Sequence, residues 1–186
     1  MTNEEILNIV KLKYKEAKLS EDGRIIMGES GHYEGSKFVA EALICIENNK
    51  IIFYHRKKDF LGYIIECKSG VEYEFKNIIE LKHILKLDIT RDDIILYLTN
   101  KFGESYSITD GVIGWMLNVK NDLCDDFIVE IDSYNNSLIL EGFTDLEDGY
   151  TIRTDKIFKA INSNEYWRLY NIINNLIGES NDKITD

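Results

Sequence analysis

The sequence contains no proline, only three cysteines, and no apolar run that approaches the roughly 20 residues needed to span a bilayer. Its first residues also lack the basic stretch and apolar core of a secretory signal peptide. Cys45, Cys67 and Cys124 are widely spaced and odd in number, which favours reduced thiols over a disulfide framework. We therefore expect a cytoplasmic protein with no transmembrane segment.

Basic side chains are scarce relative to acidic ones. The 186 residues include 22 Lys and Arg against 33 Asp and Glu, which gives a formal net charge of −11. Nucleic acid and anionic lipid both require a positive field over much of the contacting surface, so this charge argues against general binding to either. The absence of proline, with heavy use of Ile, Lys and Asn, also suggests an AT-rich coding sequence of a bacterium or phage.

The sequence has no Gly-x-Ser-x-Gly elbow, no phosphate-binding P-loop and no pair of cysteines with two-residue spacing. His32, His55 and His83 are scattered along the chain. We therefore expect no catalytic residues, no metal and no cofactor. The 44% of apolar residues is ordinary for a globular protein.

Local patterns predict the order of the elements. Helical spacing of apolar residues predicts a helix over residues 3–19, with a capping box at Thr2 and Glu5. Residues 24–109 show short β-branched and aromatic runs between turn residues, which predict about seven or eight strands, including strands at residues 85–89 and 94–99. A helix around Trp115 is predicted over residues 111–123. Three strands over residues 127–154 and a helix over residues 164–177 follow.

This order lacks regular βαβ alternation, so the predicted fold class is α+β. We expect mainly an antiparallel β meander or partly open barrel, with an N-terminal helix, a capping helix, and a C-terminal addition of three strands plus a helix. The predicted segments are an N-terminal helix (1–22), a β core with its closing helix (23–124), the C-terminal addition (125–178) and a frayed tail (179–186). The addition either completes the core or forms a separate unit.

Residues 42–118 resemble the pleckstrin-homology-like (PH-like) domains of bacterial proteins. The resemblance is carried by EALICIENNKIIFYHRK, by EYEFKNIIELKHI leading into a strand, by LKLDITRDDIILYLTNKFGESYSI, and by a closing helix with Trp115. It implies a bent, partly orthogonal β-barrel capped by a helix, and a role in binding rather than chemistry. The strands and helix after Asp125 depart from a single domain of this kind.

Acidic residues gather at two predicted turns, and they are Asp122, Asp125 and Asp126, and Asp145, Glu147 and Asp148. Grouped carboxylates steer a basic partner by long-range attraction. We therefore predict a non-enzymatic protein-binding, adaptor or inhibitor protein that presents this acidic surface to a basic partner. The sequence leaves open whether copies of the chain associate into a homo-oligomer.

One alternative is a metal-dependent nuclease of the restriction-like type. Asp59, Glu66 and Lys68 have the residue types for this chemistry, because a carboxylate followed by Glu-x-Lys on a strand holds a metal ion and positions a lysine. A nuclease site of this type would be expected to have a proline before Asp59 and a helical pattern after Lys68, and this sequence has neither.

A second alternative is a phosphate- or lipid-binding PH-like module. His55, Arg56, Lys57 and Lys58 form the one dense basic island in this acidic chain. In the PH-like interpretation they lie in the loop after the second strand of the first hairpin, where Arg56, Lys57 and Lys58 would grip a phosphate group.

Overall fold

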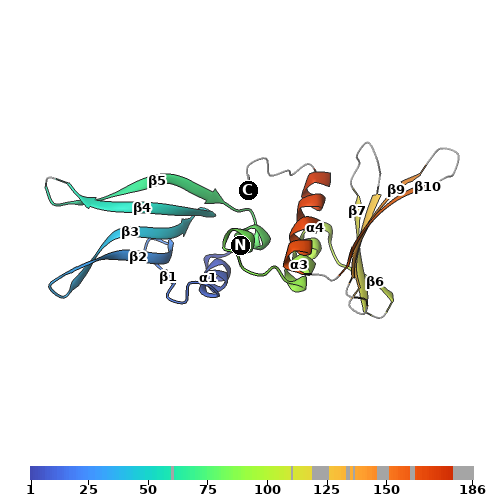
Figure 1. The fold of residues 1–186 in the computed structure, drawn as a ribbon, viewed down its shortest axis with the longest axis horizontal. Coiled ribbons are helices and arrows are strands. Elements are labelled where there is room, and N and C mark those ends of the chain that lie inside the picture. The colour runs from blue at the N-terminus through green and yellow to red at the C-terminus, as the bar shows by residue number, and fades with distance from the viewer. Residues whose placement is uncertain are drawn as a thin grey trace. The chain divides into compact units, whose positions relative to one another are not determined.

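The computed structural model describes residues 1–59, 61–109, 111–118, 126–132, 135, 137–145, 151–159 and 162–177. The chain divides into two compact units, Met1–Leu87 (unit 1) and Asp88–Asp186 (unit 2). Each unit has helices and one antiparallel sheet whose five described strands follow one another in chain order (Figure 1). The predicted α+β class, with antiparallel meanders, is therefore confirmed.

Unit 1 is a β-meander with a helix at each end of its sequence. Its elements are α1 (Asn3–Lys11), β1 (Lys18–Leu19), β2 (Ile25–Glu34), β3 (Lys37–Glu47), β4 (Lys50–Lys58), β5 (Ile64–Glu74) and α2 (Ile78–Ile84). The predicted tight turn between β3 and β4 is confirmed, since Asn48 and Asn49 have φ angles of 51° and 58°. Asparagine tolerates this left-handed conformation better than most residues, which fixes the register of Glu47 opposite Lys50.

The two faces of the unit 1 sheet differ because neighbouring residues of a strand point to opposite sides. On one face, Ile46 and Ile51 join the buried core that α1 and α2 cover with Ile6, Val10 and Leu81. On the other face, a smaller buried cluster underlies a layer of charged side chains, and it consists of Leu43, Cys45, Ile52 and Tyr54. The helices therefore cover one face of the sheet near its β3–β4 turn.

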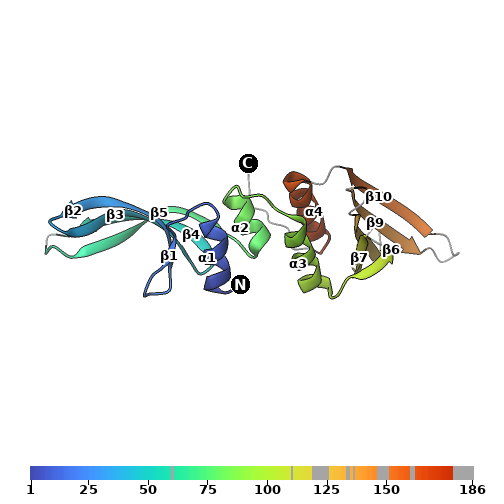
Figure 2. The ribbon, with the colours of Figure 1, turned by 90° about the horizontal axis from the view of Figure 1, so that it is seen from below.

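Helix α1 begins as predicted but ends earlier. Thr2 and Glu5 form both hydrogen bonds of the predicted capping box. The helix stops at Lys11 rather than at residue 19, because Lys18 and Leu19 pair with β2 as strand β1, which requires an extended backbone (Figure 2). Ala17 is still buried in the unit 1 core.

The turn predicted at Lys68-Ser69-Gly70 lies inside the single strand β5. Ile52 of β4 pairs with Glu72 of β5, and Tyr54 pairs with Lys68, so the segment of β5 between these pairs is longer than the facing segment of β4. Gly70, with a φ of 85°, takes the left-handed conformation at this irregularity. Gly70 therefore has a left-handed conformation, as a turn would require, but it lies at a bulge in a long strand rather than at a hairpin turn.

Unit 2 contains two helices and a second meander. Its elements are α3 (Arg91–Phe102), β6 (Tyr106–Thr109), β7 (Val112–Asn118), β8 (Asp126–Asp132), β9 (Ser137–Asp145), β10 (Thr151–Lys159) and α4 (Ser163–Leu176). One face of the sheet is buried through Trp115 and Leu117 of β7, Val129 of β8 and Leu140 of β9. Helices α3 and α4 contact each other, and α3 also contacts β7.

The predicted helix over residues 111–123 and the predicted strand over residues 94–99 are both wrong. Residues 112–118 form β7, in which Trp115 and Leu117 are buried and Met116 is exposed, the period of two that a strand requires. Residues 91–102 form α3, whose buried Ile94 and Leu98 are four residues apart and whose N-terminus has a Thr90–Asp93 capping box. The apolar residues of β7 also have a helical spacing, but pairing with β8 selects the extended conformation.

The unit boundary, between Leu87 and Asp88, lies within the predicted core of residues 23–124. The stretch that resembles a PH-like domain is divided between the units. Strands were predicted at residues 85–89 and 94–99, but residues 85–89 follow the end of α2 and form no strand, and residues 94–99 lie in α3. The last helix and the three strands before it agree with the prediction. The tail of residues 179–186 lies outside the described residues. Among the helices that the structure describes, none has both the length and the hydropathy of a bilayer-spanning segment.

Candidate functional site

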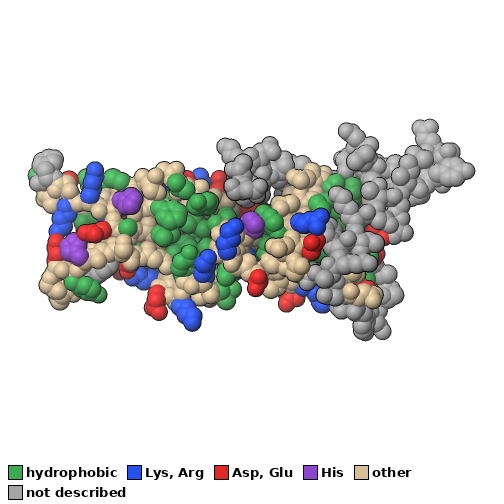
Figure 3. Space-filling model, in the orientation of Figure 1, with side chains coloured by type: hydrophobic (Ala, Val, Ile, Leu, Met, Phe, Trp, Pro, Cys, Tyr) green, Lys and Arg blue, Asp and Glu red, His purple; other side chains and the backbone are tan. Residues whose placement is uncertain are grey.

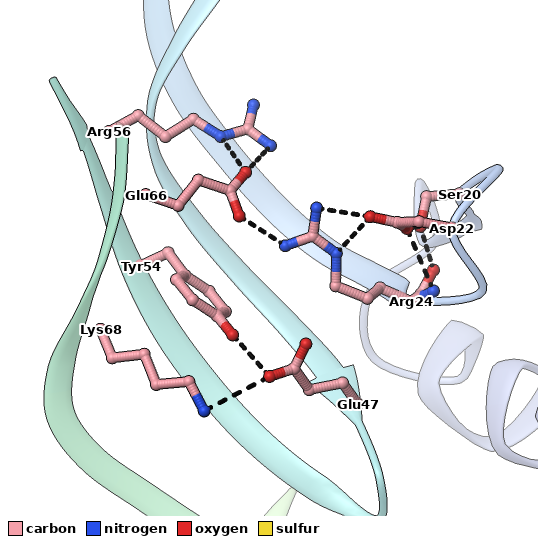
Figure 4. A network of polar contacts seen from close by, with 8 residues as sticks. All are labelled: Ser20, Asp22, Arg24, Glu47, Tyr54, Arg56, Glu66 and Lys68. Carbon is pink, nitrogen blue, oxygen red and sulfur yellow. Dashed lines mark hydrogen bonds and ion pairs between the residues drawn. The ribbon is translucent and has the colours of Figure 1, made fainter. Parts of the chain in front are cut away.

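A network of ion pairs crosses the polar face of the unit 1 sheet (Figure 4). The Glu66 carboxylate on β5 accepts hydrogen bonds from Arg24 Nη1 at 2.7 Å and from Arg56 Nε at 2.8 Å. Arg24 also donates from Nε to Asp22 at 2.8 Å. The Arg24 guanidinium holds the pKa of Glu66 below its usual range, and Arg56 adds to the effect. Glu66 therefore stays ionised between two arginines.

A second part of the network is built around Tyr54. Its hydroxyl donates to Glu47 Oε1 at 2.5 Å, and Lys68 Nζ lies 3.5 Å from the same oxygen. Burial, with the hydrogen bond to Glu47, raises the pKa of Tyr54 to about 12. Burial likewise raises the pKa of Cys45 to about 11, so this thiol is unreactive near neutral pH. No sequence pattern points to Arg24, Glu47 and Tyr54, because only strand register brings them together.

The three residues of the nuclease alternative have separate partners. Asp59 lies in the turn between β4 and β5, where its Oδ1 accepts the backbone N–H groups of Leu61 and Tyr63 at 2.9 Å each. Glu66 is held by two arginines, and Lys68 pairs with Glu47 and Glu72. Glu66 and Lys68 do share one face of β5, as predicted. In the part of the chain that the structure describes, no three His, Cys, Asp or Glu side chains form a metal-binding group.

Acid should weaken unit 1 through Glu66. A carboxyl group whose folded-state pKa is depressed contributes stability above its unfolded-state pKa, and this contribution is lost as the pH falls through the folded-state value. We expect the melting temperature to fall from about pH 5 to about pH 3, and Glu66→Gln to lower it at pH 7 and to flatten its decline in acid. Circular dichroism melts across this range measure both effects.

The matched control for Glu66→Gln is Glu74→Gln on the same strand. The Glu74 side chain is well exposed and lies 3.8 Å from Lys50 Nζ, so the neutral substitution should leave the acid profile nearly unchanged. An acid profile that is the same in wild type and Glu66→Gln would contradict the role given to the two arginines.

The basic island lies in a strand, which corrects the predicted loop position. His55, Arg56, Lys57 and Lys58 belong to β4, since this strand continues to Lys58. Arg56 pairs with Glu66 at 2.6 Å, and Lys58 pairs with Glu34 at 2.8 Å. Of the three cations Arg56, Lys57 and Lys58, only Lys57 has no ion pair with another described residue. A phosphate group would have to displace carboxylates from two of the three cations.

The negative charge of the chain belongs entirely to unit 2. Unit 1 contains 14 of the 22 Lys and Arg residues and 14 of the 33 Asp and Glu residues, so its formal net charge is zero. Unit 2 contains the other 8 basic and 19 acidic residues, a net charge of −11. The long-range field of the protein therefore arises from residues 88–186.

All six residues of the predicted acidic surface belong to unit 2. Asp126 begins β8 and Asp145 ends β9, and the pairing of Asp126 with Phe143 puts both positions at the same end of the sheet. The other four, which are Asp122, Asp125, Glu147 and Asp148, lie outside the described residues. Glu130, which was not among the predicted acidic residues, is partly exposed and lies on the sheet face opposite the buried Val129 and Ile131.

The face of the unit 1 sheet that α1 and α2 partly cover continues into an apolar groove of about 570 Å³. Gly28, Ile44, Phe53, Val71 and Tyr73 are among the residues that line it. Hydrophobic side chains gather over the middle of unit 1, and charged and histidine side chains gather toward its hairpin end (Figure 3). Glu29 is the one carboxylate among the described residues that line the groove, and it pairs with Lys18 at 2.9 Å.

A second hollow, of about 530 Å³, lies where the two hairpins of unit 1 separate. Pairing of β3 with β4 extends only as far as Ala42 opposite His55. Beyond it, β3 continues with β2 and β4 continues with β5, so the hairpins form a fork. The hollow is lined by His32, Glu34, Glu41, Lys57 and Ile64, among others.

The chain matches no protein-family model, and neither the curated proteins nor the solved structures contain a significant match to it.

Proposed function

We propose that this protein is a non-enzymatic binding protein whose acidic unit 2 docks on a basic surface of another protein. The observation that carries the proposal is the division of charge, zero in unit 1 and −11 in unit 2. Charge concentrated in one unit creates a stronger local field than the same charge spread over the chain, and such a field accelerates the encounter with an oppositely charged partner.

A binding role rather than catalysis is supported by the state of the ionisable groups in unit 1. Glu66, Lys68 and Asp59 each have structural partners, and the buried Cys45 thiol has a raised pKa. A nucleophile or general base needs a free lone pair, and a thiol nucleophile needs a pKa near the working pH. Glu66, Lys68 and Asp59 are engaged by their partners, and the pKa of Cys45 lies well above neutral. A partner that itself binds nucleic acid would be inhibited, because unit 2 would occupy its basic surface.

The proposal is tested by affinity capture from a lysate of the native host at low and high salt. The wild-type protein should retain a basic partner at low salt and release it at high salt, since screening weakens exposed charge pairs. The unit 2 variant carries Asp122→Asn, Asp125→Asn and Asp126→Asn. We expect it to bind the purified partner about tenfold more slowly at low ionic strength.

The matched control removes the same number of charges from unit 1. Glu4, Glu16 and Glu21 are exposed, and the variant Glu4→Gln, Glu16→Gln and Glu21→Gln should bind like the wild type. Equal losses in the two triple variants would show that only the overall charge matters. A partner that resists salt, or that binds the unit 2 variant normally, would overturn the proposal.

A further inference from the structure

The fork of unit 1 leaves two strand edges without a partner strand. Beyond the pair of Ala42 and His55, β3 continues to Lys37 beside β2 alone. Over the same stretch, β4 continues to Lys58 beside β5 alone, and Figure 1 shows β3 and β4 separating at the left. Among the described residues, no strand lies between these two edges. An unpaired edge presents a row of N–H and C=O groups with which another strand can pair.

On β4, the N–H and C=O groups of Arg56 and Lys58 point into the fork. Asp59 and Tyr63 extend the pairing of β4 with β5 by one position, and the Asp59 N–H donates to the Tyr63 carbonyl at 2.8 Å. In antiparallel sheets, residues that bond to one neighbouring strand alternate with residues that face the other side. Lys57 therefore directs its backbone groups toward β5, whereas Arg56 and Lys58 direct theirs toward β3.

On β3, Ala40 faces the fork in the same way. A Cβ atom placed on Gly31 of β2 would overlap the Val39 carbonyl oxygen, so this oxygen points toward β2. Ala40 is the next residue along the strand, and its N–H and C=O groups therefore point toward β4. The two edges of the fork thus present backbone donors and acceptors to the same space.

The space between the edges is the hollow of about 530 Å³, and residues from both hairpins line it. This volume lies within the range of roughly 300–1,000 Å³ that is typical of ligand sites. At a rise of about 3.3 Å per residue, the unpaired stretch of β4 matches about three or four residues of an extended chain. The hollow therefore has the dimensions of a short strand.

The charges around the hollow favour an acidic ligand. Glu34 pairs with Lys58 at 2.8 Å, and Glu41 lies 2.9 Å from His32 Nδ1, so both carboxylates that line the hollow already have partners. Lys57 is exposed and has no ion pair with another described residue. An acidic side chain in the fork would pair with Lys57 without displacing another carboxylate.

We propose that the fork of unit 1 binds an extended, acidic peptide segment of a partner protein, which inserts between β3 and β4 as an additional strand. An extended backbone presents N–H and C=O groups on both of its sides at the spacing that the two edges require. It pairs with Ala40 on one side and with Arg56 and Lys58 on the other, and its acidic side chain contacts Lys57. The site does not depend on the basic partner of unit 2.

Selection of random hexapeptides from a displayed library on the full chain tests the proposal. The enriched peptides should be rich in β-branched residues, carry an acidic residue and lack proline, because proline removes a donor from the inserted strand. A library from which no peptide is enriched would overturn the proposal.

Hydrogen exchange of the backbone amides locates the selected peptide. At saturation, exchange of the Arg56 and Lys58 amides should slow by about tenfold or more, because these N–H groups become paired. The Lys57 amide is the internal control, since it already bonds to β5 and should change little. A peptide that slows exchange elsewhere and leaves Arg56 and Lys58 unchanged would contradict binding in the fork.

Methylation of the peptide amides distinguishes insertion from addition to an outer edge of the sheet. A strand that lies between two others donates alternate N–H groups to both of them. Methylating either alternate set should therefore weaken binding by about fivefold or more. If only one set matters, the peptide binds a single edge and the insertion is wrong.

The contact with Lys57 is tested by Lys57→Gln. This variant should bind the acidic peptide about two- to fivefold more weakly, and it should bind the peptide with glutamine in place of the acidic residue like the wild type. The matched control is Lys76→Gln, because Lys76 is exposed and follows Phe75, whose N–H donates to the Asn49 carbonyl at the other end of the sheet. Equal losses in the two variants would contradict the contact, and circular dichroism spectra check that both are folded.

Discussion

Trp115→Ala is expected to lower the free energy of unfolding of unit 2 by about 3–5 kcal/mol. Trp115 is 1% exposed and lies opposite Val129 on the buried face of the sheet. Replacing it with alanine leaves a cavity among residues that relax only in part, so both burial and packing are lost. Chemical denaturation followed by circular dichroism measures the loss.

Trp115→Phe separates packing from hydrogen bonding at the same position. The Trp115 indole Nε1 is buried and has no hydrogen-bond partner among the described residues. Phenylalanine keeps most of the ring contacts and removes this unpaired donor, so we expect a loss of about 1–2 kcal/mol. Met116→Ala is the control, since Met116 is 54% exposed on the opposite face and should change stability by less than about 0.5 kcal/mol. A Trp115→Ala variant as stable as Met116→Ala would contradict the buried position.

Gly31→Ala is expected to destabilise the hairpin of β2 and β3 by about 1–3 kcal/mol. A Cβ atom at Gly31 would overlap the carbonyl oxygen of Val39 and lie 2.8 Å from Ala40 Cα. These are backbone atoms of the paired strand, which cannot rotate away as a side chain does. The close approach occurs at a bulge, where Ser30 faces Ala42 but Gly31 faces Ala40.

Gly28→Ala is the matched control on the same strand. A Cβ at Gly28 would have no atom within 4 Å, so this substitution should alter stability by less than about 0.5 kcal/mol. Chemical denaturation and hydrogen exchange of the β2 and β3 amides report global and local stability. Equal exchange rates in the two variants would show that the bulge does not require glycine.

Elements whose signals lie within a few residues were predicted from the sequence. The capping box of Thr2 and Glu5 and the cap of helix α4 at Asn162 rest on hydrogen bonds to backbone groups at most three residues away. The turn at Asn48 and Asn49 rests on the left-handed conformation of these two residues. Such interactions form whatever the rest of the chain does. The strands β8, β9 and β10 were also predicted, because their alternation and the turns between them are local.

Elements that depend on distant pairing were predicted incorrectly. The apolar residues of β7 satisfy both a helical and a strand period, and only the pairing of Trp115 with Val129 selects the strand. In α3 the run Ile94-Ile95 suggested a strand, although the Thr90–Asp93 capping box was also present in the sequence. If the capping box is given more weight than the apolar run, the sequence predicts the helix.

The sequence by itself determined the net charge, the α+β class, the antiparallel meanders and the main local caps and turns. Only the tertiary structure decided where the first unit ends, and therefore that Met1–Leu87 is neutral while the whole charge of −11 belongs to the rest. It also decided that Arg24 meets Glu66, 42 residues away, and that Lys58 of one hairpin of unit 1 pairs with Glu34 of the other. Charge and local propensity are properties of individual residues, whereas the register of paired strands depends on the whole sheet.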